Sequence, residues 1–315
     1  MDREKPVDAG ILGQLVLSQI PRILGLCDRQ PDSPHQGCFD RLYWNYRIAD
    51  FPSIWMQDGS LLLALLYGHS FAGNLYHQKG AMREWAQSAI NFWVRCLHRD
   101  GSGDEVYPYE RSFCATAFSA CAATEALMLL EGDMPERLAA TGTWLGRRAQ
   151  SEAANQLAAA SLALYNIALL GRDAKMERAS EEVVLFLLDN QDGEGYFPEY
   201  GGCDIGYLSI TLSFLAQLHR KNGDSRIWEG AQRALAFLEN KIREDGTFDY
   251  HSGSRQTQYL YPFGFAYFAS PILERMVNGL RDNQIVNPAW MDDRYVIPMT
   301  LDYLKAHLYL DVECP

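Results

Sequence analysis

Apolar residues recur at three- and four-residue spacing along most of this chain, as they do on the buried face of an α-helix. Strand-like alternation of apolar and polar residues is nearly absent. The pattern predicts helices over residues 9–27, 60–70, 82–97, 112–130, 135–149, 153–170, 174–189, 205–220, 227–242, 258–280 and 299–310. The sequence therefore predicts an all-α protein.

Four Asp-Gly pairs, each followed by aromatic and polar residues, divide the helices into units. They are Asp58-Gly59, Asp100-Gly101, Asp192-Gly193 and Asp245-Gly246. The spacings are 42, 92 and 53 residues, and 92 is two units of 46, so residues 147–155 keep the period without the pair. A repeat of about 40–50 residues is typical of stacked supersecondary units. We therefore predict an α/α toroid, or barrel, of five to six helical hairpins.

A second class of loop joins the helices within each unit. It occurs at Glu131-Gly132-Asp133, Gly171-Arg172-Asp173 and Asn222-Gly223-Asp224, where a Gly ends one helix and an Asp caps the next. These loops follow the more apolar helices, whereas the Asp-Gly pairs follow the more charged ones. We expect the two classes at opposite ends of the toroid, with the site among the longer, chemically richer Asp-Gly loops.

The length of 315 residues allows one large core, and no Pro/Ser-rich linker divides the chain. We predict a single toroid domain over residues 1–315. Residues 1–40 would form an N-terminal helix and lead-in, and residues 281–315 a C-terminal segment that closes the ring.

Charge and cysteine use narrow the partners and the compartment. The net charge is −12 and there is no run of basic residues, which argues against nucleic acid. No signal-peptide core and no apolar run of membrane-spanning length is present, so we expect no membrane insertion. Seven scattered cysteines without a CxxC pair suggest reduced thiols and a cytoplasmic location.

The segments that follow the Asp-Gly pairs carry titratable residues at equivalent offsets. If the ring closes, these residues meet at one cavity. They are Glu110, Arg111, Glu199, Asp204, Tyr207, His251, Arg255 and Tyr259.

Aromatic and amide side chains in the same segments favour a carbohydrate substrate. Sugar rings pack their C–H faces on aromatic rings, and their hydroxyls need polar partners. The predicted substrate-binding residues are Trp44, Trp55, Asp58, Tyr107, Tyr109, Asn155, Gln156 and Tyr200, together with Glu110, Arg111 and Arg255.

Proton abstraction next to a uronate carboxylate fits these residues best, and it would make the protein a lyase or an epimerase. Tyr207, His251 or Tyr259 would transfer the proton, and Arg255 and Arg111 would hold the carboxylate. Glu199, Asp204 and Glu110 would bind hydroxyls or orient the base.

Three alternatives stay open. A glycoside hydrolase would pair Glu199 with Asp204 or Glu110. A non-catalytic glycan-binding or scaffold subunit would keep the ring alone. A terpenoid-cyclase-like toroid is disfavoured because the chain has neither a DxDD nor a DDxxD motif. We expect no cofactor and no metal, since Cys203, Asp204 and His251 lack tight ligand spacing.

Several short motifs between residues 38 and 269 resemble those of heparinase II/III-like or prenyltransferase-like toroid proteins found with bacterial polysaccharide-biosynthesis genes. The matching motifs are Phe197-Pro198-Glu199-Tyr200-Gly201-Gly202, Asp204-Ile205-Gly206-Tyr207 and Gly253-Ser254-Arg255. The resemblance implies a toroid fold and association with polysaccharide-synthesis enzymes. The oligomeric state is left open.

Overall fold

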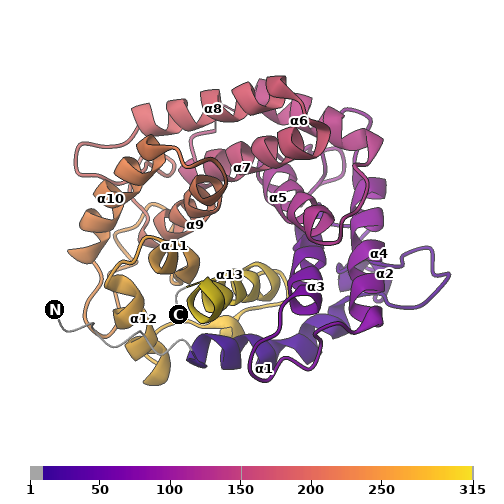
Figure 1. Cartoon of the computed structure of the whole chain (residues 1–315), viewed down its shortest axis with the longest axis horizontal. Helices are drawn as coiled ribbons and strands as arrows, with labels where there is room; N and C mark the ends of the chain where they lie inside the picture. Colours follow the sequence, from indigo (N-terminus) through magenta and orange to yellow (C-terminus); the bar gives the residue numbers. More distant parts are fainter. Residues whose placement is uncertain (1–9, 150, 314–315) are drawn as a thin grey trace.

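The computed structural model describes residues 10–149 and 151–313, and these residues form two concentric rings of helices (Figure 1). The inner ring consists of α3 (Gly59–Gly68), α5 (Phe113–Leu129), α7 (Ala154–Gly171), α9 (Ile205–Asn222), α11 (Pro262–Tyr267) and α13 (Val296–Leu308). The outer ring consists of α1 (Gly10–Leu26), α4 (Gly80–Cys96), α6 (Glu136–Arg148), α8 (Ala174–Asp189), α10 (Ser225–Glu239) and α12 (Ile272–Arg281).

Four short elements complete the secondary structure of the described residues. They are α2 (Arg41–Trp44), the 3-10 helices η1 (Ile54–Asp58) and η2 (Pro288–Trp290), and the π-helical turn η3 (Tyr309–Glu313). The described residues contain isolated β-bridges but no strand. None of their helices is both long enough and apolar enough to cross a membrane.

The inner ring is closed. Each inner helix packs against the inner helix before it and the one after it, and α13 packs against both α11 and α3. The first and last helices complete the circle, because α1 lies on the outside of α13 and forms the sixth hairpin with it. The prediction of a single all-α toroid of helical hairpins is confirmed.

Side-chain size and polarity decide which helices form which ring. Along α7, Ala158, Ala159, Ala160 and Ala163 are fully buried, so neighbouring helices can approach closely on more than one side. The outer helix α10 buries only one stripe and exposes the rest. A helix that is apolar all round belongs inside the ring, and an amphipathic one covers it.

The Asp-Gly pairs are not all equivalent. Asp100, Asp192 and Asp245 each accept a hydrogen bond from the backbone N–H two residues later, as expected for turns that follow outer helices. Asp58-Gly59 instead forms the start of α3, and Gly59 has a helical φ of −55°. Its glycine is needed for close packing, since a Cβ there would lie 2.4 Å from the Phe39 ring. The prediction of a turn at residues 58–59 is wrong.

Two further predictions of helix boundaries are corrected. The helix predicted over residues 258–280 is two short helices, α11 and α12, because Pro271 follows a break in which Ala269 adopts a φ of +54°. Asp133 does not cap α6, which begins two residues after Met134, behind Pro135. At the other two short loops, Asp173 and Asp224 do cap their helices, as predicted.

Ring closure by α1 can be tested by truncating a side chain on its buried stripe. Ile20 is fully buried, so Ile20→Ala should lower the free energy of unfolding by about 2–5 kcal/mol. Urea unfolding followed by circular dichroism measures this change. Ile48 is 74% exposed, and the matched Ile48→Ala should change stability by less than about 0.5 kcal/mol. Equal effects of the two variants would contradict the packing role of α1.

Candidate functional site

Three cavities follow one another through the centre of the inner ring. The first, which we call the aromatic cavity, has a volume of about 220 Å³ and lies where the inner helices begin. The second, the carboxyl cavity, is only about 30 Å³ and contains Asp58 and Asp302. The third, the basic cavity, is about 330 Å³ and lies where the inner helices end. The aromatic and carboxyl cavities share Phe118 and Tyr261, and the carboxyl and basic cavities share Lys305.

The aromatic cavity gathers many of the side chains that the sequence singled out. The predicted residues in its wall are Trp55, Asn155, Gln156, Tyr200, Tyr207, Arg255 and Tyr259. They come from four different loops and helix starts, so the ring brings them together. Their individual roles stay predictions.

Other predicted residues lie outside this cavity. Tyr107 and Tyr109 are 67% and 79% exposed. The carboxylate of Glu110 accepts hydrogen bonds from the backbone of its own loop, the closest at 2.7 Å from Val106 N. Arg111 forms an ion pair of 3.1 Å with Asp100.

Trp44 and His251 also serve local contacts. The indole N–H of Trp44 donates to the Leu26 carbonyl at 2.7 Å. His251 is exposed, and its ring centroid lies 4.1 Å from that of Tyr250. Neither side chain lines the aromatic cavity.

Glu199 and Asp204 are buried, and their carboxyl groups form hydrogen bonds that connect neighbouring units of the ring. The two oxygens of Glu199 accept from the backbone N and the Nδ2 of Asn155, at 2.7 and 2.9 Å. Asp204 caps α9 through Tyr207 N and accepts from the backbone N–H groups of Arg255 and Thr257. Both carboxyl groups already have protein partners, so neither is placed to act as the acid or base of a hydrolase.

The tyrosines of the cavity are weak bases. Burial raises the pKa of Tyr207 to about 12 and holds that of Tyr259 well above its ordinary value. A tyrosine removes a proton only as the phenolate, so these pKa values oppose the proton abstraction that we predicted. In the described part of the chain, no group of three or more His, Cys, Asp or Glu side chains is arranged to hold a metal ion.

Burial also raises the pKa of Glu199, to about 8, but Asp58 differs from Glu199 and Asp204 because one of its oxygens has no partner in the part of the chain that the structure describes. It is buried, it lines the carboxyl cavity, and its Oδ1 has no hydrogen-bond partner among the described residues. Burial raises its pKa from 3.8 to about 7, and the charge of Lys305 offsets only part of this effect. A neutral carboxyl group that faces a cavity without a partner can give its proton to a ligand.

A hydrogen-bonded chain lies beside Asp58 in the same wall. Asp302 accepts from the Ser213 hydroxyl and, at 2.9 Å, from Phe263 N. Lys305 donates to Gln217 at 2.6 Å, and Gln217 donates to the Ser213 carbonyl at 3.1 Å. Burial raises the pKa of Asp302 to about 6, but its partners hold it in place, unlike Asp58.

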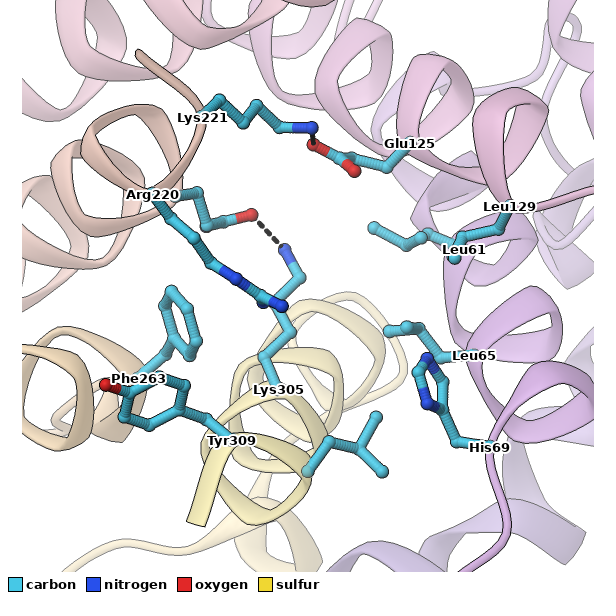
Figure 2. Close-up of a pocket in the computed structure, with 12 residues that line it drawn as sticks. Leu61, Leu65, His69, Glu125, Leu129, Arg220, Lys221, Phe263, Lys305 and Tyr309 are labelled. Atoms are coloured by element: carbon cyan, nitrogen blue, oxygen red, sulfur yellow. Dashed lines mark hydrogen bonds and ion pairs between the residues drawn. The ribbon is translucent and has the colours of Figure 1, made fainter. Parts of the chain in front are cut away.

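The basic cavity at the other end is amphipathic (Figure 2). Leucines from α3, α5 and α13 form one side, and Lys305 and Arg220 point into the centre. Lys221 forms an ion pair of 3.0 Å with Glu125. Burial lowers the pKa of Lys305. The inner helices end here, and the negative ends of their dipoles favour these cations.

Sequence reasoning missed several residues of the cavities. Phe118 and Tyr261 looked like core aromatics, and they separate the aromatic cavity from Asp58. Asp302 and Lys305 are three positions apart on an apolar helix, a spacing that puts them on one face and could have identified them.

Comparison with solved structures shows a known fold. A structure of the type II terpene cyclase MstE from Scytonema, with its product merosterolic acid A, matches 96% of this chain and 98% of that chain, with a TM-score of 0.54 and 12% identity. A second MstE structure, without ligand, matches 95% and 97%, with a TM-score of 0.51 and 10% identity. No protein-family model and no curated protein matches the sequence.

These matches correct the functional prediction. Both matched structures are of a type II terpene cyclase, and one of them holds its product, so the prediction of a carbohydrate-active lyase, epimerase or hydrolase is wrong. The prediction of a carbohydrate partner is therefore also wrong, and no match supports a role in polysaccharide biosynthesis. The matches agree with the alternative that we disfavoured, a terpenoid-cyclase-like toroid.

The raised pKa of Asp58 should make the free energy of unfolding depend on pH. The native state keeps this proton up to about pH 7, whereas the unfolded chain loses it near pH 3.8, so stability falls as pH rises between these values. Asp58→Asn cannot ionise. Relative to wild type, its free energy of unfolding should therefore rise by roughly 3–4 kcal/mol from pH 4 to pH 8. Denaturant unfolding at each pH measures this, and a constant difference would contradict a neutral Asp58.

Proposed function

We propose that this protein is an enzyme that binds an isoprenoid chain in the aromatic cavity and starts its cyclisation by protonating a carbon–carbon double bond. Asp58 is the proton donor. The observation that carries the proposal is the buried, unpartnered Asp58 carboxyl group next to an aromatic-walled cavity in the centre of the ring. The toroid that the protein shares with type II terpene cyclases supports it.

The wall of the cavity suits a reaction that passes through carbocations. Trp55 packs against Phe118 with a ring-centroid distance of 4.8 Å, and Phe118 packs against Phe214 at the same distance. Tyr259 lies 6.0 Å from both Tyr261 and Tyr295. Aromatic faces attract cations by roughly 2 kcal/mol when the cation is desolvated. Such a wall lowers the energy of a cation that moves along an isoprenoid chain.

The proposed reaction balances without a co-reactant. The Asp58 O–H bond breaks, and the π electrons of the terminal double bond form a new C–H bond. The cation left on the neighbouring carbon is attacked by the next double bond, which closes a ring. The last cation loses a proton to water, and the Asp58 carboxylate takes up a proton from water, which restores the acid. The product is therefore an isomer of the substrate.

Removal of the proton from Asp58 should abolish turnover and leave the fold intact. We expect Asp58→Asn to reduce product formation by about 10²–10⁴-fold, the usual contribution of a general acid. The assay incubates the protein with isoprenoid alcohols, acids and diphosphates in D₂O and detects cyclic isomers by gas chromatography–mass spectrometry. One solvent deuterium in the product identifies protonation of a double bond.

The matched control is Asp189→Asn, since Asp189 is exposed at the end of the outer helix α8. It should form product at the wild-type rate. Unchanged product formation by Asp58→Asn would rule out Asp58 as the donor. Binding of isoprenoids without product by the wild-type protein would instead indicate a carrier.

Phe118 should stabilise the cation closest to the donor, because it lines both the aromatic and the carboxyl cavity. Phe118→Leu keeps an apolar side chain but removes the π face, so we expect about a tenfold lower rate with little change in substrate affinity. Product formation and equilibrium binding measure the two effects. Phe186→Leu, on the outer helix α8, is the control. A normal rate in Phe118→Leu would contradict cation stabilisation at this position.

A further inference from the structure

The rim of the aromatic cavity carries two arginines. The Arg255 guanidinium lies 4.7 Å above the Tyr200 ring, and Gln156 Nε2 donates to the Tyr200 hydroxyl at 2.9 Å. Arg255 also hydrogen-bonds the Tyr207 side chain. These contacts hold Arg255 beside the opening, and none of them supplies a carboxylate. Arg294 enters the same wall from the segment before α13.

Two buried donors in this wall have no acceptor. Arg294 Nη2 forms an ion pair with Glu105, but its Nε has no hydrogen-bond partner in the described part of the chain. The indole N–H of Trp55 also lacks a partner among these residues, although Trp55 is only 7% exposed. A buried donor without an acceptor is destabilising. The wall therefore has more donors than acceptors.

The charges at the rim favour an anion, against the trend of the whole chain. The chain has a net charge of −12, yet two arginines face one carboxylate, Glu105, in this wall. Asp204 lies nearby, but backbone N–H groups surround it. The inner helices α5, α7 and α9 begin at this end, and the positive ends of their dipoles add to the field.

The basic cavity offers a weaker case for an anion. Lys221 there is paired with Glu125, Lys305 donates to Gln217, and the helices present their negative ends. Figure 2 shows these partners within the cavity. At the rim of the aromatic cavity, by contrast, Arg294 is paired with Glu105, but Arg255 forms no ion pair among the described residues.

We propose that the substrate carries an oxyanion head group, such as a carboxylate or a phosphate, that binds Arg255 and Arg294 at the rim of the aromatic cavity. This inference rests on the proposed function and narrows its substrate to an anionic isoprenoid. Arginine is suited to the task, because its planar fork donates two parallel hydrogen bonds to such a group.

The head group fixes the direction of the chain. Arg255 and Arg294 lie at the rim, and Asp58 lies beyond Phe118 and Tyr261 in the next cavity. A chain held by its anionic end at the rim therefore extends past the aromatic wall and presents its far end to Asp58. The double bond most distant from the head group is the one that receives the proton.

Binding of matched ligands tests the head-group site without turnover. The ligands are geranylgeranoic acid, its methyl ester and geranylgeranyl diphosphate, titrated against the full chain by calorimetry. We expect the ester to bind at least about tenfold more weakly than the acid. Arg255→Met and Arg294→Met should each lower the affinity for the acid by a similar factor. Their affinity for the ester should stay within twofold of that of wild type. The diphosphate arm shows whether a phosphate binds more tightly than a carboxylate.

Controls separate this inference from the proposed function. Arg178→Met, on the exposed side of α8, should bind all ligands as wild type does, and Arg255→Lys should recover only part of the affinity. Asp58→Asn should bind the acid normally. Equal affinity of wild type for acid and ester would overturn the head-group site and leave isoprenoid binding intact. Failure to bind any of the three would overturn both proposals.

Discussion

Closure of the inner ring is the constraint on which the other features depend. The circle is closed because α13 packs between α11 and α3 and is covered by α1. Within it, residues near the starts of α5, α7 and α9 line the same cavity. Segments that are far apart in the sequence then meet there, which places Trp55, Tyr207, Arg255 and Arg294 in one wall. An open stack of the same hairpins would leave these side chains on separate surfaces. The aromatic cavity is thus formed by several units of the closed ring together, and no single unit forms it alone.

Burial inside the circle decides what each carboxyl group can do. Glu199 and Asp204 lie between neighbouring units and accept hydrogen bonds from the chain, so they join the units together. Burial raises the pKa of both Asp58, to about 7, and Glu199, to about 8, so a raised pKa does not distinguish them. What distinguishes Asp58 is an oxygen without a hydrogen-bond partner among the described residues, which leaves its proton available to a ligand. Keeping such an acid in the core lowers stability at neutral pH.

The sequence predicted much of the fold and less of the site. Helical periodicity and the repeat of the Asp-Gly pairs were enough for the toroid, because each repeat is a local pattern. Asp58 was predicted as a substrate-binding residue, but its burial at the start of α3 could not be predicted, since the close packing of Gly59 against the Phe39 ring involves a separate segment. Phe118 and Tyr261 have the composition of ordinary core residues, and only their place between two cavities distinguishes them.

The mistaken carbohydrate prediction has an instructive physical cause. Tyrosines, arginines and carboxylates are needed both by sugar sites and by this cavity, so residue types alone cannot separate the two. What separates them is where hydrogen-bonding capacity is left unused. A sugar ring needs polar partners on all its edges, whereas here the unsatisfied donors belong to Trp55 and Arg294, Arg255 lies beside them, and ring faces line the path to Asp58. A ligand that matches this distribution is polar at one end and apolar along its length, which describes an isoprenoid with a charged head group better than any glycan.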